Sequence, residues 1–288
     1  MNPTEERQIM TGNPPRAKLP VDRTAEMSFL EHLEELRWRI IKGAGGIGLG
    51  IIIAFFFSEF LIEEVLLGPA KSDFIVYTFF EKFFGMNIVD LTLQSRRLPG
   101  QFFTYWGMLI LVGAILGSPV FFYQMWAFIS PALESSEKWK TRLHTVFITT
   151  FFLAGICFGY FVLVPFALQF FTQFQIAEVV RNDFDINQYF SSLATWVISC
   201  GVIFQLPVIS YFLAKFGFLT PEFLRTYRRH AIAACFIISA ALTPPDPISQ
   251  TLVAVPLIFL YQLSIYITKI GVRQRERELK RAFGDIPE

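Results

Sequence analysis

Long apolar stretches separated by short polar connections occupy most of the 288-residue chain. A transmembrane helix needs roughly 20 consecutive apolar residues, with a range of about 17–25. The chain has six such stretches, free of Asp, Glu, Arg and Lys except for Lys42 at the edge of the first: 41–58, 102–126, 144–171, 193–213, 230–243 and 248–268. This pattern predicts an all-α integral membrane protein with six transmembrane helices.

The six predicted spans differ in length. At roughly 1.5 Å per residue the fifth, from His230 to Thr243, covers about 21 Å, whereas the hydrocarbon core of a bilayer is about 30 Å thick. The third is long, because its apolar run continues past Pro165 to about Phe174. Unequal, tilted helices predict a cupped bundle with a concave face.

Basic residues indicate which side of the membrane each connection occupies. An even number of spans places both termini on one side. That side carries twenty of the 25 Lys and Arg residues, in the N-terminal segment, the connections 127–143 and 214–229, and the C-terminal tail. Because cytoplasmic connections are rich in Lys and Arg, we expect both termini to be cytoplasmic.

The parts outside the membrane have distinct compositions. Residues 1–27 are polar and contain several prolines, which predicts a disordered cytoplasmic leader before the membrane domain, 28–268. Residues 269–288 form a basic cytoplasmic tail. The first external connection, 59–101, is long and aromatic, so we expect a structured cap there.

Composition excludes several classes of function. The chain is 53% hydrophobic with a mean hydropathy of +0.46, and its net charge of +1 gives no case for nucleic-acid binding. Three widely spaced cysteines without a CxxC, and three separated histidines, argue against a metal site. No nucleophile-and-base pair, HExxH, GxSxG or phosphate loop is present, so neither an enzyme nor a cofactor is expected.

Two charged segments beside the spans are candidate binding sites. Residues 28–41, SFLEHLEELRWRII, form a predicted interfacial helix whose Glu35 lies four residues before Arg39. This helix either orients the first span or offers an acidic rim to a basic ligand. In the connection before the third span, Glu134 and Glu137 follow the apolar Trp126 and Phe128.

The connection before the third span admits two interpretations. Glu137 falls in the first turn of the span, where a negative charge interacts favourably with the helix dipole. Alternatively, Glu134 and Glu137 bind a peptide that carries basic residues next to an apolar stretch.

Small and polar residues inside the spans suggest helix contacts. Gly-x-x-x-Gly spacings at 46/50 and 155/159 predict close helix packing, within the chain rather than between subunits. Gln205 and Gln250 are polar groups at membrane depth, where such groups usually bond across helices. The short fifth span, the turn that starts at Thr243, and Gln250 together predict a polar seam where a partner helix docks.

Four segments together resemble the TatC family, the core subunit of the twin-arginine protein translocase: FLEHLEELRWR, SPVFFYQMWAFISPAL followed by Glu137, GYFVLVPFAL, and LTPPDPISQTLVAVP. The resemblance extends from residue 28 to about 262. The resemblance implies a cupped six-helix receptor in the cytoplasmic (inner) membrane. It binds twin-arginine signal peptides and assembles with itself and with single-span subunits of the TatA/TatB type.

The resemblance also assigns roles to residues. It implies that Glu137 faces the paired arginines, that Glu35 and Arg37 belong to the same site, and that Phe128 supplies an aromatic contact. Gln205 stands where many relatives carry a glutamate associated with partner docking. The alternative function is a small secondary transporter, but the spans lack the ionisable residues at mid-membrane that such proteins use.

Overall fold

The computed structural model describes residues 29–84, 88–129, 138–175, 177, 182–243 and 247–283. The chain divides into two compact units, Met1–Arg37 and Trp38–Glu288. In the first unit, the described residues form the beginning of helix α2 (Phe29–Phe56). The second unit contains the remaining elements and is described below by itself.

Long apolar helices dominate the second unit. Among the described residues, five helical segments are long and apolar enough to cross a membrane: His32–Phe56, Gly100–Ile129, Arg142–Gln173, Ile186–Phe216 and Gln250–Arg277. They coincide with the predicted first, second, third, fourth and sixth spans. The protein is therefore an all-helical membrane protein, with two strands of two residues each among the residues that the structure describes.

The predicted fifth span forms a helix that is too short to count among these five. Helix α11 (Arg228–Leu242) has 15 residues, so at roughly 1.5 Å per residue it is about 22 Å long. Its side chains Phe236, Ile237 and Ile238 are exposed, as expected for a surface that faces lipid rather than water.

Prolines coincide with two interruptions of the helices. The third span consists of α6 (Lys138–Phe158), the π-helical turn η4 (Gly159–Leu163) and α7 (Val164–Gln173). Pro165, which lacks an N–H, lies two residues after the π turn. The fourth span consists of α8 (Ile186–Ile203) and α9 (Leu206–Phe216), which begins with Leu206 and Pro207.

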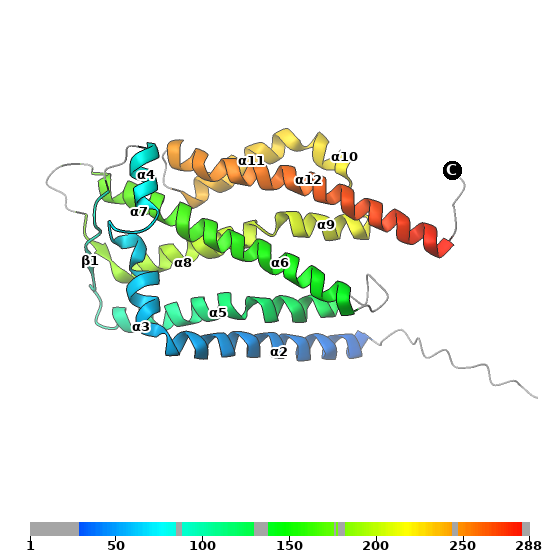
Figure 1. Ribbon diagram of the computed structural model, residues 1–288, viewed down its shortest axis with the longest axis horizontal. Coiled ribbons are helices and arrows are strands. Elements are labelled where there is room, and N and C mark those ends of the chain that lie inside the picture. The colour runs from blue at the N-terminus through cyan, green and yellow to red at the C-terminus, as the bar shows by residue number, and fades with distance from the viewer. Residues whose placement is uncertain are drawn as a thin grey trace, which may run out of the picture. The chain divides into compact units, whose positions relative to one another are not determined.

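Glycines allow α2 to approach α5 (Gly100–Ile129) closely (Figure 1). A Cβ atom on Gly50 would collide with the carbonyl of Gly113, and one on Gly117 would collide with the backbone of Ile47. Similarly, Gly155 of α6 lies against the backbone of α8. The Gly-x-x-x-Gly spacings therefore serve packing within the chain, as predicted.

The remaining helices pack around this framework. Helix α12 (Pro247–Phe283) packs along α9 and α11, and Figure 1 shows it extending beyond the short α10 (Pro221–Thr226). It has 37 residues, so it is about 55 Å long. The segment predicted as a basic tail is thus helical as far as Phe283.

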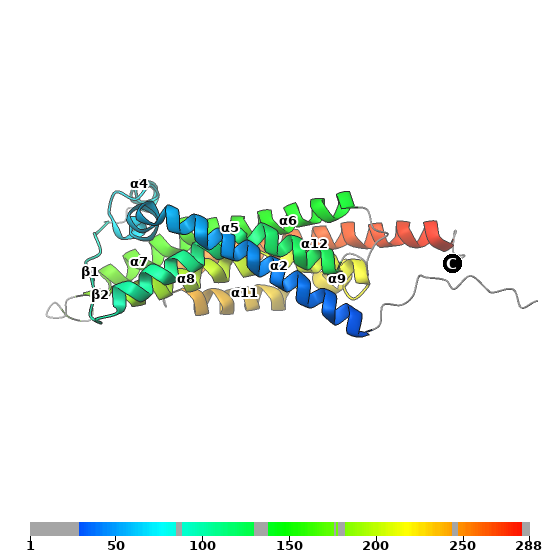
Figure 2. The same cartoon turned by 90° about the horizontal axis from the view of Figure 1, so that it is seen from below.

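A cap of short elements covers one end of the second unit, the end predicted to be external (Figure 2). Its elements are α3 (Ser58–Phe60), η1 (Leu61–Leu66), η2 (Gly68–Ala70), α4 (Tyr77–Phe84), and the parallel strands β1 (Leu93–Gln94) and β2 (Phe184–Asp185). Two tyrosines, one buried and one half-buried, hold the cap in place. Tyr189 donates to the carbonyl of Leu66 at 2.6 Å, and Tyr160 donates to that of Val65 at 2.7 Å. The expected structured cap is therefore present in the described part of 59–101.

Candidate functional site

The residues predicted to bind a signal peptide lie on two different parts of the chain. Phe128 is half-buried in the last turn of α5. Glu134 and Glu137 lie outside the described residues. Glu35 is half-buried and Arg37 exposed, both on the part of α2 that belongs to the first compact unit.

Beside Phe128, an aromatic cluster joins the end of α5 to the start of α6 and the end of α9. The Trp126 ring is 3% exposed and stacks on Phe212 with a centroid distance of 4.2 Å. His144 lies against the same ring at 4.9 Å. Trp126 was expected in an apolar patch, but the pattern along the chain gave no sign of its neighbours on α6 and α9.

The residues predicted to dock a partner helix make bonds within the chain. Gln205, at the interruption between α8 and α9, donates from its Nε2 to the carbonyl of Ile148 in α6 at 3.1 Å. Gln250 donates to the carbonyl of Phe236 at 3.2 Å. Both polar groups therefore bond across helices, as their depth in the membrane suggested.

Ser239 connects the other two predicted docking residues. The Thr243 hydroxyl donates to its carbonyl at 2.8 Å, while the Ser239 hydroxyl donates to the carbonyl of Gln250. The structure thus brings Thr243 and Gln250 into one polar seam between α11 and α12. In the described contacts Gln205 bonds to α6 instead of joining this seam.

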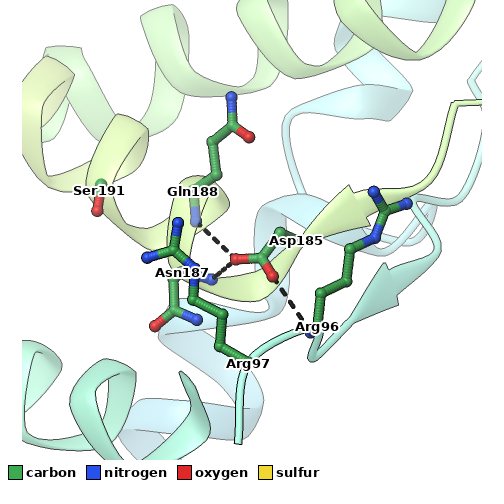
Figure 3. A pocket seen from close by; sticks show the side chains of 6 residues that line it. All are labelled: Arg96, Arg97, Asp185, Asn187, Gln188 and Ser191. Atoms are coloured by element: carbon green, nitrogen blue, oxygen red, sulfur yellow. Dashed lines mark hydrogen bonds between the residues drawn. The ribbon is translucent and has the colours of Figure 1, made fainter. Parts of the chain in front are cut away.

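A charged pocket of about 430 Å³ lies at the opposite, predicted external end (Figure 3). Its residues are Arg96, Arg97, Asp185, Asn187, Gln188 and Ser191. The Asp185 carboxylate caps α8 by accepting hydrogen bonds from the backbone N–H groups of Asn187 and Gln188. It also accepts one from the backbone N–H group of Arg96 at 3.2 Å. No motif in the sequence indicated this pocket.

Two opposing effects set the pKa of the Asp185 carboxyl group. Desolvation raises the pKa of its carboxyl, but the hydrogen bonds from backbone N–H groups outweigh it, so the pKa lies below its ordinary value. Arg96 also pairs with Asp183 at 3.9 Å, and both side chains are too exposed for this pair to contribute much stability. The charge of Arg96 is thus balanced locally, and the geometry fits a structural clamp between β1 and β2.

Comparisons with known proteins agree with the sequence motifs. The family described as Sec-independent protein translocase protein (TatC) matches residues 31–256. A TatC of Blattabacterium sp. subsp. Periplaneta americana is 38% identical over 256 residues, covering 84% of this chain and 95% of that protein. TatCy of Bacillus subtilis is 32% identical, covering 88% and 92%. The chloroplastic TATC of Pisum sativum is 34% identical, covering 90% and 68%.

A solved structure shares the fold. The crystal structure of the twin-arginine translocase receptor TatC aligns with a TM-score of 0.63 at 32% identity, over 84% of this chain and all of that one. Sequence and structure agree over the same portion of the chain, which sets aside a secondary transporter. The chain therefore belongs to the TatC family and is a receptor subunit of the twin-arginine (Sec-independent) protein translocase, not an enzyme.

Proposed function

We propose that this chain binds the paired arginines of the signal peptide through Glu137, assisted by Glu35, and that Phe128 contacts the apolar residues beside them. The observation that supports this most is the position of Phe128, in the last turn of α5 and nine residues before Glu137. The chain thus places an aromatic side chain and carboxylates on one short stretch, in a family of twin-arginine receptors.

The chemistry of the ligand favours carboxylates. An arginine side chain carries a delocalised charge on a planar fork of donors, which suits bidentate hydrogen bonds to a carboxylate. Glu134 adds negative charge close to Glu137 in the sequence. Arg37 is the basic member of the proposed N-terminal site and lies on the same helix as Glu35.

We further propose six transmembrane helices in a cupped, concave bundle with both termini in the cytoplasm, α11 being the fifth span. Twenty of 25 basic residues on one side support this topology. The leader 1–27 and the tail 269–288 would then flank the membrane domain on the cytoplasmic side. A helix as short as α11 requires either a locally thinned bilayer or shelter by neighbouring helices.

Partner subunits are the second part of the proposal. The seam of Thr243 and Gln250 lies beside the exposed apolar face of α11, where a single-span helix of the TatA/TatB type would find both a lipid-like surface and polar groups. Gln205 provides a second contact on the fourth span. In this proposal the chain also assembles with itself, in the cytoplasmic (inner) membrane.

Direct binding of a labelled signal peptide to the purified full-length protein tests the recognition site. The twin-arginine peptide should bind, and a twin-lysine version should bind more weakly because lysine cannot form the bidentate contact. Losing a charge-assisted hydrogen bond should weaken binding of the twin-arginine peptide to the Glu137→Gln variant about ten- to a hundredfold. Equal affinity of the wild type for both peptides would overturn the proposal.

A further inference from the structure

Five side chains from four helices meet at the end of the second unit that carries Phe128. They form the amide-aromatic cluster, which consists of Trp126 of α5, His144 of α6, Tyr211 and Phe212 of α9, and Gln274 of α12. The chain positions of these residues span almost 150 residues. The cluster is thus the place where α12 is connected to the ends of α5 and α6.

The hydrogen bonds in the cluster run in one direction. Tyr211 donates its hydroxyl hydrogen to Oε1 of Gln274 at 2.6 Å. A tyrosine hydroxyl has a single hydrogen, so in its 3.2 Å contact with Nε2 of His144 the Tyr211 oxygen accepts and the histidine donates. Oε1 of Gln274 therefore orients the Tyr211 hydroxyl, which in turn presents its oxygen to His144.

Stacking carries this orientation to α5. The Trp126 ring is buried between His144 and Phe212, and its Nε1 has no hydrogen-bond partner within the described residues. The ring is therefore held by packing alone, against these two rings and within a cluster that includes the buried Ile148 and Val208. Phe128 follows two residues later in the last turn of α5, so packing that holds Trp126 also holds the backbone turn that carries Phe128.

We infer that the amide-aromatic cluster positions the end of α5 for binding of the twin-arginine signal peptide, and that Gln274 makes this binding depend on α12. This inference rests on the function proposed above. Tyr211, His144 and Gln274 act as positioning residues, because they act through Trp126 and Phe128 and do not themselves contact the peptide. The family resemblance assigned no role to α12 in recognition.

Paired substitutions of Gln274 separate positioning from bulk stability. Gln274→Leu removes the acceptor for Tyr211, whereas Gln274→Glu keeps an oxygen in its place. We expect the purified full-length Gln274→Leu variant to bind a labelled twin-arginine peptide about fivefold to tenfold more weakly, and Gln274→Glu to bind it within about twofold of the wild type. Tyr211→Phe should reproduce the loss.

Matched controls come from the same helix. Gln262 and Tyr266 of α12 are exposed and lie outside the cluster, so Gln262→Leu and Tyr266→Phe should bind the peptide like the wild type. All variants are compared at equal abundance and with their thermal midpoints recorded. Weaker peptide binding by Gln274→Leu at an unchanged thermal midpoint identifies positioning, whereas a loss of binding that follows a lowered midpoint would overturn the inference.

The possible outcomes distinguish the inference from the function on which it rests. If the wild type does not prefer the twin-arginine peptide to the twin-lysine peptide, the proposed function is wrong. If the wild type shows this preference but Gln274→Leu binds like Gln262→Leu, the inference is overturned. Equal losses in Gln274→Leu and Gln274→Glu would also overturn it, because an acceptor at position 274 would then not matter.

Discussion

Replacing Gly113 by alanine tests the close approach of α2 and α5. A Cβ atom there would lie 2.7 Å from the backbone nitrogen and Cα of Ile51, whereas carbon atoms pack best at about 3.5–4.0 Å. The two helices would have to separate by about 1 Å. Such overpacking typically costs about 1–3 kcal/mol.

A second glycine on the same pair of helices, but away from their contact, provides the control. Gly48 of α2 has no heavy atom within 4 Å of the Cβ position, so Gly48→Ala gains helix propensity without a collision. Because both substitutions change glycine to alanine within a helix, their difference isolates the cost of overpacking.

Thermal unfolding of the purified protein in mild detergent measures this difference. At about 2–4 °C per kcal/mol for a chain of this size, we expect Gly113→Ala to unfold at least about 2 °C below Gly48→Ala. Equal midpoints for the two variants would refute the role assigned to these glycines.

Three further predictions concern the cap and the partner seam. Burial raises the pKa of Tyr77 to about 12, so the stability that its neutral form provides below pH 10 is lost as the pH rises towards 12. Thermal unfolding followed from about pH 9 to 12 should therefore show a smaller loss of stability in Tyr77→Phe than in the wild type. The lowered pKa of Asp185 stabilises the folded state above the ordinary carboxyl pKa. The advantage of the wild type over Asp185→Asn should therefore shrink as the pH falls below that ordinary value towards the lowered one, and an advantage that does not depend on pH would contradict this. Gln250→Leu loses one exposed hydrogen bond, worth about 0.6 kcal/mol, so it should unfold almost like the wild type. It should nevertheless lose crosslinks to single-span partners, and unchanged crosslinks would place the docking surface elsewhere.

Hydrophobic patterning was sufficient to locate the helices but not their ends. The predicted first span begins at 41 because charged residues precede it, whereas α2 begins at Phe29. No proline separates the amphipathic segment from the apolar one, so one helix continues through both. For the same reason α12 continues past the predicted limit at 268 to Phe283. Polarity marks where a helix leaves the membrane, and only a helix-breaking residue or cap marks where it ends.

The contacts of the candidate site could be predicted only in part. The Gly-x-x-x-Gly spacings are local, so their use in packing could be predicted from the sequence. The partners of Gln205 and Trp126 lie on other helices, at positions that no periodicity connects. The carbonyl of Ile148 and the ring of Phe212 reach them only through tertiary packing, which a pattern along one chain does not specify.

Export of a folded protein that carries a twin-arginine signal peptide tests the recognition site most directly. Cells without their own TatC would produce this chain and its partners, either as the wild type or as the Glu137→Arg variant, with membrane abundance measured in both. Because Glu137→Arg replaces the acceptor by a charge that repels the paired arginines, we predict that the wild type exports the cargo and the equally abundant variant does not. Export of the same cargo by a normally abundant Glu137→Arg variant would contradict the account.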